Sequence, residues 1–308
     1  MKHLLKISDL TRDEFDALMK LTAKLKKEQK DGVEHHILKG KTLGMIFTKS
    51  STRTRVSFET GMYQLGGQAL FLSSNDIQLG RGETIYDTAN VLSRYIDGIM
   101  IRTFKQSDVE DLAKFGQIPI INGLTDDHHP CQVLADMFTI IEHKGSLDGI
   151  KFAYIGDGNN MANSLMEVCA LAGVDCAIAT PENYACQQQF VDGAKKMAEK
   201  SGSTLDISCD PVRAIKDADV VYSDTWVSMG QEEEKAERLK IFMPYQINKE
   251  LWSHAAKDAI FMHCLPAYRG YEVTEDIIDS PCSVIFDEAE NRLHAQKAVM
   301  AAVMGGVL

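Results

Sequence analysis

Hydroxyl and cationic side chains gather in one short segment, Ser50 to Arg55 (Ser-Ser-Thr-Arg-Thr-Arg). It follows an apolar run, Thr42 to Phe47, typical of a buried strand, and precedes an amphipathic stretch, about Val56 to Leu65, that predicts a helix. A helix N-terminus presents unpaired backbone N–H groups and the positive end of its dipole. Because hydroxyls and guanidinium groups beside such a terminus favour a phosphate, the segment predicts a phosphate site.

This segment is not a nucleotide-binding P-loop. Gly-x-x-x-x-Gly-Lys-Ser/Thr is absent, and no glycine lies between Lys49 and Arg55. The alternative is that the hydroxyls cap a helix while the arginines pair with surface acids. Two arginines and four hydroxyls within six residues favour the phosphate site.

A second turn, Gly156 to Asn160, follows the apolar run Phe152 to Ile155. The third glycine of Gly-x-Gly-x-x-Gly would fall at Met161, so the turn does not predict a nicotinamide cofactor. Asn159 and Asn160 either cap the following helix or offer an amide to a substrate.

Four further polar clusters also follow apolar runs, where strands are expected to end. They are Arg102, Asp126 to Gln132, Asp224 to Gly230, and His263 to Pro266. Ligands of open α/β sheets bind at the carboxyl ends of the strands. Taken singly, each cluster has a structural explanation: a surface cation, a helix-initiating turn, a cap and a buried thiol.

Short apolar runs alternate with helical patterns along the chain, which indicates α/β domains with parallel sheets covered by helices. We place the domain division at the polar, glycine-containing segment Lys144 to Gly149. The predicted domains are residues 1–145 and 146–290, with a final helix at about 291–308 packing back onto the first domain. The strands expected in the second domain are Phe152 to Ile155, Cys176 to Ala179, Val220 to Tyr222, Ile260 to His263 and Val284 to Phe286.

Composition narrows the class of protein. A chain of 308 residues is long enough for two domains, each with its own core. The formal net charge of −11 disfavours a nucleic-acid or anionic-membrane surface, since those need a basic footprint. The seven cysteines are odd in number and include no Cys-x-x-Cys pair, which predicts reduced thiols and no zinc site. Neither a signal peptide nor an apolar run long enough to span a membrane is found, so we expect a cytoplasmic protein.

Taken together and in this order, the clusters resemble the ornithine carbamoyltransferases of the aspartate/ornithine carbamoyltransferase superfamily. The run Thr52-Arg53-Thr54-Arg55 at a strand end matches the superfamily signature. The other motifs that carry the resemblance, over nearly the whole chain, are Gly82 to Ala89, Arg94 to Arg102 and Asp287 to Gln296. Tyr268 departs from the family, where many members have histidine, but it lies outside the core of its motif.

The resemblance implies a reaction and an architecture. Carbamoyl phosphate would bind first, and the δ-amine of L-ornithine would attack it to give L-citrulline and phosphate, as in arginine biosynthesis. The active site would lie in the cleft between the two domains, and the active unit would be a homotrimer or a multiple of it. Carbamoyl phosphate is already activated, so neither a cofactor nor a metal is expected.

The resemblance also implies roles for individual residues. The catalytic residues would be Arg102, His129, Asp224 and Cys264. Carbamoyl phosphate would be held by Ser51, Thr52, Arg53, Thr54, Gln78, Arg102, His129, Gln132, Cys264, Leu265 and Arg292. Of these, Gln78 would reach into the site of a neighbouring subunit. Ornithine would be held by Asn160, Asp224, Ser228 and Met229.

Two rival functions remain. A carbamoyltransferase for another amine, such as putrescine, would leave Asn160, Ser228 and the Met229 amide without a partner, because putrescine has no α-carboxylate. A catalytically silent paralogue that only binds phosphate-containing ligands could lose His129, Gln132 or Cys264, but all are present. An acid at position 224 favours an ammonium-bearing substrate over the two carboxylates of aspartate.

Overall fold

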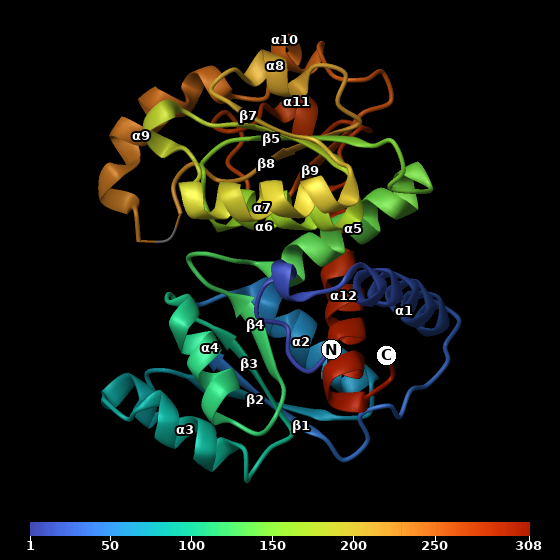
Figure 1. Cartoon of the computed structure of the whole chain (residues 1–308), viewed down its shortest axis with the longest axis vertical. Helices are drawn as coiled ribbons and strands as arrows, with labels where there is room; N and C mark the ends of the chain where they lie inside the picture. The colour runs from blue at the N-terminus through green and yellow to red at the C-terminus, as the bar shows by residue number, and fades with distance from the viewer. Residues whose placement is uncertain (229) are drawn as a thin grey trace. The chain divides into compact units, whose positions relative to one another are not determined.

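The computed structural model describes residues 1–228 and 230–308. The chain divides into two compact units, one of residues 1–138 with 290–308 and the other of residues 139–289. Each unit is built on a parallel sheet flanked by helices (Figure 1). This confirms the predicted α/β fold class. Among the described helices, none combines the length and apolar character that crossing a membrane requires.

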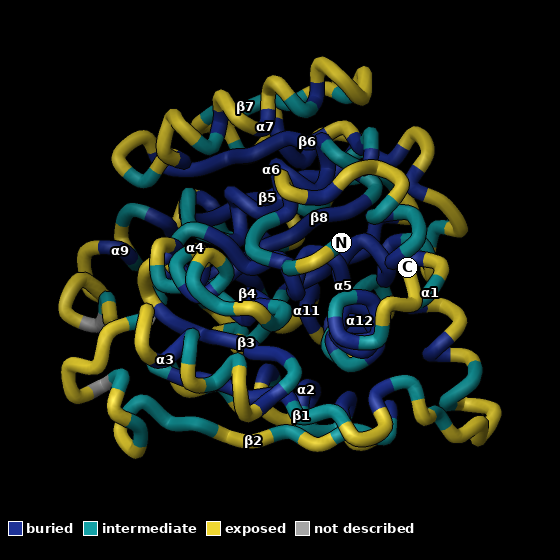
Figure 2. The backbone as a smooth tube through the Cα atoms, turned by 60° about the horizontal axis from the view of Figure 1, so that its bottom comes forward, coloured by how far each residue is buried: buried dark blue, intermediate teal, exposed yellow. Residues whose placement is uncertain are grey.

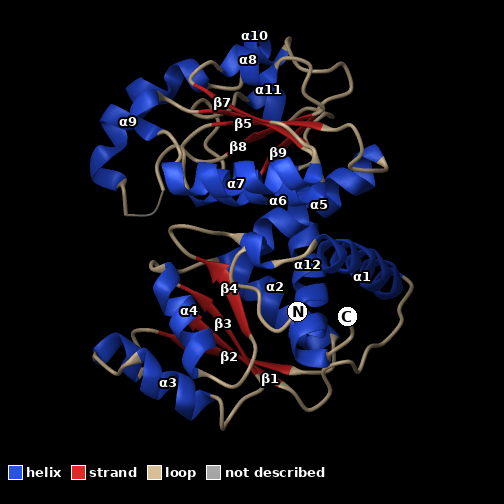
Figure 3. Cartoon of the chain, viewed as in Figure 1, coloured by secondary structure: helices blue, strands red, loops and turns tan. Residues whose placement is uncertain are grey.

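The first unit carries a sheet with the strand order β2-β1-β3-β4. Figure 3 shows α3 and α4 on one face of this sheet and α2 and α12 on the other. The strands are β1 (Thr42–Phe47), β2 (Gln68–Ser73), β3 (Gly98–Arg102) and β4 (Ile120–Leu124). The helices are η1 (Ile7–Asp9), α1 (Arg12–Lys30), α2 (Thr52–Gln64), η2 (Gln78–Arg81), α3 (Ile85–Leu92), α4 (Gln106–Phe115), and parts of α5 (Pro130–Lys144) and α12 (Ile285–Gly305).

The second unit carries a sheet with the order β7-β6-β5-β8-β9. Figure 3 shows α6 and α7 on one face and α8, α10 and α11 on the other. The strands are β5 (Lys151–Ile155), β6 (Asp175–Ala179), β7 (Leu205–Ser208), β8 (Val220–Ser223) and β9 (Ile260–His263). The helices include α6 (Asn160–Ala172), α7 (Gln188–Ser201), α8 (Pro211–Ile215), α9 (Lys235–Phe242), α10 (Lys249–Trp252) and α11 (Glu275–Ile278).

Strand burial differs between the two edges of each sheet, since the edge strands β4 and β9 are mostly buried while β2 and β7 are not. The inner strands β1, β3, β5 and β8 are mostly buried, as the dark tubes of Figure 2 show, whereas the edge strand β2 is largely exposed or half-buried. Continuous apolar runs are typical of strands covered on both faces. The edge strand β7 is half-buried along its length and lacks such a run, which explains why the sequence did not predict it.

The structure corrects two of the predicted elements. Helix α2 begins at Thr52, not at about Val56, because Ser51 is its N-cap and accepts a hydrogen bond from the Thr54 N–H at 3.3 Å. The predicted strand Val284 to Phe286 is wrong, since α12 begins at Ile285. The Val284 N–H donates to the Phe261 carbonyl, after which the chain turns into the helix, and a short apolar run cannot distinguish these two cases.

Helix α12 carries a fully buried lysine, Lys297, whose Nζ has no hydrogen-bond partner among the described residues. Burial lowers the pKa of Lys297 to about 8, although nearby Glu28 opposes the shift. The folded state therefore binds this proton less tightly than the unfolded state, and the charged lysine costs stability at neutral pH.

Replacing Lys297 with methionine is expected to raise the free energy of unfolding at pH 7 by about 3 kcal/mol, because an uncharged side chain of similar length removes that cost. The gain should fall as the pH rises from about 8 to about 10.4, where the unfolded lysine also loses its proton. Urea denaturation at pH 7 and pH 10.5 measures it. The exposed Lys20→Met is the control, and an equal gain there would contradict the explanation.

Candidate active site

The carboxyl ends of β1, β3 and β4 bring three of the predicted clusters together. Phe47 is in register with Arg102, and Arg102 with Leu124. The backbone N–H and hydroxyl of Thr48 donate to the Arg102 carbonyl at 2.9 and 3.1 Å. Lys49, in the loop after β1, forms an ion pair with Asp126, in the loop after β4.

The two arginines of the signature, Arg53 and Arg55, lie in the first turn of α2 but differ in burial. The Ser51 hydroxyl donates to Thr54 Oγ1 at 3.1 Å, and Thr54 is buried. Arg55 turns to the surface, where its Nε lies 2.9 Å from Glu59 and its guanidinium 3.8 Å from the ring centroid of Phe71. The expectation of a surface ion pair therefore holds for Arg55, while Arg53 is half-buried in the helix's first turn next to Thr52.

Arg292 is buried and joins α12 to α5 and α2 through its guanidinium. Its Nη1 donates to Gln132 Oε1 at 2.6 Å, Nη2 to Thr54 Oγ1 at 3.3 Å and Nε to Gln296 Oε1 at 2.9 Å. Gln132 in turn donates to Asp136 at 2.8 Å. The sequence implied Arg292 only by family resemblance, and the structure places it beside Thr54 and Gln132.

His129 lies buried among cations. Its pKa is lowered well below 6.5, first by burial and then by the charges of Arg292, Arg102 and Arg53. The imidazole is therefore neutral at pH 7. Guanidinium groups from α12, β3 and α2 thus converge on one histidine, and such a concentration of positive charge suits an anion.

Gln78 is the first residue of η2, and its side chain is exposed. Its reach into a neighbouring subunit remains a prediction.

The second unit brings together side chains from the ends of β5, β8 and β9. Asp224 Oδ2 accepts a hydrogen bond from Asn159 Nδ2 at 2.8 Å. Its Oδ1 accepts from the Thr225 N–H at 2.7 Å and from Cys264 Sγ at 3.1 Å. Asn160 is the first residue of α6. The buried carboxylate of Asp224 therefore stands between an amide, a thiol and a helix N-terminus.

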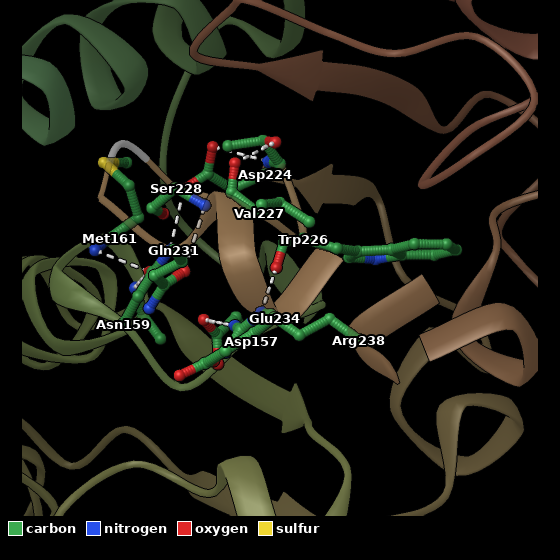
Figure 4. Close-up of polar contacts among 12 residues, drawn as sticks. Asp157, Asn159, Met161, Asp224, Trp226, Val227, Ser228, Gln231, Glu234 and Arg238 are labelled. Atoms are coloured by element: carbon green, nitrogen blue, oxygen red, sulfur yellow. Dashed lines mark hydrogen bonds and ion pairs between the residues drawn. The ribbon is translucent and has the colours of Figure 1, made fainter. Parts of the chain in front are cut away.

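The segment after Asp224 is held by a residue that the sequence analysis missed, Arg238 in α9. Its Nε donates to the Trp226 carbonyl at 2.6 Å, and its Nη2 pairs with the buried Asp157 (Figure 4). The Ser228 N–H donates to Gln231 Oε1 at 3.0 Å. No signal in the sequence marks Arg238, because its burial depends on contacts with distant parts of the chain. Met229, the fourth predicted ornithine ligand, lies outside the described residues.

Leu265 follows Cys264 in an unusual conformation. Its φ of 56° is in the left-handed region, which residues other than glycine rarely adopt. The Leu265 N–H donates to His263 Nδ1 at 2.9 Å, and His263 Nε2 lies 3.3 Å from Glu272. These contacts hold the turn and fix the direction of the Leu265 carbonyl.

Ligand atoms of Asp224, His263 and Cys264 lie within 4.8 Å of one another, a proximity that the sequence did not predict. Nδ1 of His263 already accepts a hydrogen bond from the Leu265 N–H, and Nε2 lies 3.3 Å from the Glu272 carboxylate without a hydrogen bond among the described residues. A metal would have to displace one of these two groups. The arrangement is that of a hydrogen-bonded network.

Gly158 explains the resemblance of its turn to a dinucleotide fingerprint. A Cβ added there would lie 2.4 to 2.5 Å from backbone atoms of Tyr184, Ala185 and Cys186. The glycine is therefore required for packing of the turn against this segment.

Comparisons with known proteins agree with this geometry. Residues 2–142 match the family model described as the aspartate/ornithine carbamoyltransferase carbamoyl-P binding domain, and residues 148–303 match that of the Asp/Orn binding domain. The chain belongs to the aspartate/ornithine carbamoyltransferase family.

Relatives within the aspartate/ornithine carbamoyltransferase family are similar over their full length. The ornithine carbamoyltransferase of Thermococcus kodakarensis is 58% identical over 99% of this chain and 97% of its own. The anabolic ornithine carbamoyltransferase of Pyrococcus furiosus is 56% identical over 99% and 97%. A solved structure of ornithine carbamoyltransferase from P. furiosus has a TM-score of 0.96 and 55% identity, covering 100% of this chain and 98% of that one. The resemblance found in the sequence is thereby confirmed.

Proposed function

We propose that the chain transfers the carbamoyl group of carbamoyl phosphate to the δ-amine of L-ornithine, giving L-citrulline and phosphate. The δ-nitrogen attacks the carbonyl carbon, the bond from that carbon to the bridging oxygen breaks, and phosphate leaves with the bonding electrons. The δ-ammonium group loses two of its three protons, which pass to phosphate and solvent, and the third stays on the δ-nitrogen of citrulline. Full-length relatives at 55–58% identity bear this activity in their names.

The observation that carries the proposal is the buried cluster in which Arg292 donates hydrogen bonds to Gln132 and Thr54, beside a His129 whose pKa is lowered by burial and by the charges of Arg292, Arg102 and Arg53. The arginines and the N-terminus of α2 would neutralise the phosphoryl oxygens. As the carbonyl carbon becomes tetrahedral its oxygen gains negative charge, and Thr54, Arg102 and His129 would donate to it. The full proposed set is Ser51, Thr52, Arg53, Thr54, Gln78, Arg102, His129, Gln132, Cys264, Leu265 and Arg292.

In the second unit, Asp224 would pair with the α-ammonium group of ornithine, and Asn160, Ser228 and Met229 would hold its α-carboxylate. Cys264 would face the δ-nitrogen. The Sγ of Cys264 donates a hydrogen bond to Asp224, so it is oriented as a thiol and not as an attacking thiolate. The pair would orient the amine and help to deprotonate it, since the intrinsic pKa of such an amine is roughly 10.

An amine panel tests the substrate. We expect citrulline formation from ornithine to exceed carbamoylputrescine formation from putrescine, because putrescine lacks the α-carboxylate that the proposed ligands would hold. Faster turnover of putrescine would contradict the proposed substrate. Binding of carbamoyl phosphate without carbamoylation of any amine would indicate a silent paralogue.

We further propose that the active unit is a homotrimer, or a multiple of it. The edge strand β2 and the neighbouring face of α2 expose apolar side chains, including Val56, Tyr63, Leu70 and Phe71. Exposed apolar patches commonly mark interfaces between proteins. Sedimentation analysis should give a mass of three chains or a multiple of three.

A cytoplasmic, biosynthetic role completes the proposal. The seven cysteines all lie among the described residues and are free thiols, as expected in a reducing compartment. The P. furiosus relative named above is described as anabolic, which supports a place in arginine biosynthesis.

The pair of Asp157 and Arg238 should make ornithine binding sensitive to acid. Burial raises the pKa of Asp157 to about 6, although Arg238 opposes the shift. Below about pH 6 the carboxylate becomes protonated and its pairing with Arg238, which holds the Trp226 carbonyl, weakens. We expect the KM for ornithine to rise as the pH falls from 7 to 5, and to vary less in Asp157→Asn, where it should be high throughout.

The stability of the fold should not decrease along with ornithine binding as the pH falls. Because the pKa of Asp157 is raised in the folded state, the folded chain binds this proton more tightly than the unfolded chain between about pH 6 and pH 4. Protonation of Asp157 therefore favours folding while it weakens the site. If the KM for ornithine depended on pH in Asp157→Asn as it does in the wild type, Asp157 would not be the group that makes ornithine binding sensitive to acid.

A further inference from the structure

Asn159 uses both ends of its side-chain amide. Its Oδ1 accepts hydrogen bonds from the backbone N–H groups of Met161 at 2.9 Å and Ala162 at 3.3 Å, which caps α6 (Figure 4). Its Nδ2 donates to Asp224 Oδ2 at 2.8 Å. The partners fix the orientation of the amide, since two N–H donors face its oxygen and a carboxylate faces its nitrogen.

Asn159 is placed to control the orientation of Asp224. The other carboxylate oxygen, Oδ1, is held by the Thr225 N–H and by Cys264 Sγ. The donor from Asn159 therefore fixes the oxygen that would otherwise have more freedom to rotate. Through its cap, the same side chain also fixes the first turn of α6, which begins at Asn160.

We propose that Asn159 is a positioning residue for the amine substrate, acting through Asp224. The inference rests on the proposed function, because Asp224 is the group that would pair with the substrate ammonium. Without the amide donor, Asp224 would lose a charge-assisted hydrogen bond and the orientation that this bond imposes. The amine would then bind more weakly, while the carbamoyl phosphate ligands of the first unit would be unaffected.

The rival explanation is that Asn159 serves only as a helix cap, and substitution by aspartate separates the two roles. Aspartate is as good an N-cap as asparagine, and its charge is favourable at a helix N-terminus. A carboxylate cannot donate to Asp224, however, and would repel it. A purely capping role therefore predicts that Asn159→Asp leaves the KM for ornithine unchanged.

For Asn159→Asp we expect the KM for ornithine to rise about 10-fold to 100-fold, as for loss of a hydrogen bond to a charged group. The binding constant for carbamoyl phosphate should stay close to that of the wild type, whereas repulsion between the new carboxylate and the buried Asp224 should lower the melting temperature. Asn248→Asp is the matched control, because Asn248 caps α10 by accepting from the Leu251 N–H at 3.0 Å. It should leave both kinetic constants unchanged.

An unchanged ornithine KM in a folded Asn159→Asp enzyme would overturn the inference. Asn159→Ser is the second variant, since serine can cap the helix without offering an amide to Asp224. It should also raise the ornithine KM, by about 10-fold. If Asn159→Ser raises the KM only together with a lower melting temperature, the role is structural and the inference also fails. A wild-type enzyme that forms no citrulline would instead refute the proposed function.

Discussion

Replacing His129 with leucine is expected to lower kcat about 100-fold to 1,000-fold, the usual cost of removing one donor to a developing oxyanion. The pKa of His129 is lowered well below 6.5, so the imidazole is neutral at pH 7 and acts as a donor without carrying charge. Leucine introduces no buried charge and has a similar volume, so the fold should be retained. Steady-state citrulline formation gives kcat, and equilibrium binding of carbamoyl phosphate should change much less than kcat.

His129→Gln is the matched control for this change. Glutamine offers an N–H donor on a side chain of comparable length, so it should recover part of the rate that leucine loses. Because His129 stays neutral, its titration should not affect kcat between pH 8 and pH 6. The wild type and His129→Gln should therefore show the same dependence of kcat on pH over this range. Leucine and glutamine variants with equal kcat would show that His129 is not a donor.

Replacing Asp224 with asparagine is expected to lower kcat/KM for ornithine about 100-fold or more, the loss typical of removing one charge from a buried ion pair. The substitution keeps the shape of the side chain. It removes the negative charge that would attract the substrate ammonium, and it places an amide opposite the Asn159 amide that donates to Asp224 at 2.8 Å. Initial rates over a range of ornithine concentrations measure the effect.

Asp206→Asn is the control for Asp224→Asn. Asp206 pairs with Arg213 on the surface of the same unit, its Oδ1 lying 2.6 Å from Nη2 of that arginine. Exposed ion pairs of this kind contribute little, so activity should be unchanged. An Asp224→Asn enzyme with wild-type kcat/KM would remove Asp224 from the amine site.

The polar clusters were the most predictable part of the molecule. Each follows an apolar run, and the structure places Lys49, Arg102, Asp126, Asp224 and Cys264 at or just beyond the carboxyl ends of parallel strands. Apolar runs reveal buried strands because both faces of such a strand are covered. Their order in the sheet, which makes β1, β3 and β4 neighbours, follows from pairings between distant segments and was not predicted.

The sequence was less informative where the local pattern is ambiguous. It placed a strand at Val284 to Phe286, where the helix α12 begins, and it missed the half-buried edge strand β7. Arg238 was missed for a different reason. Its role depends on Asp157 and the Trp226 carbonyl, which come from other parts of the chain, and no local spacing encodes those contacts.

A crystal structure with bound carbamoyl phosphate would test the phosphate site at the N-terminus of α2 most directly. We expect the phosphoryl oxygens within hydrogen-bond distance of the backbone N–H groups at the start of α2 and of Arg53, with the carbonyl oxygen facing His129. Phosphoryl density at any other place, with Arg53 paired to surface carboxylates, would contradict the account.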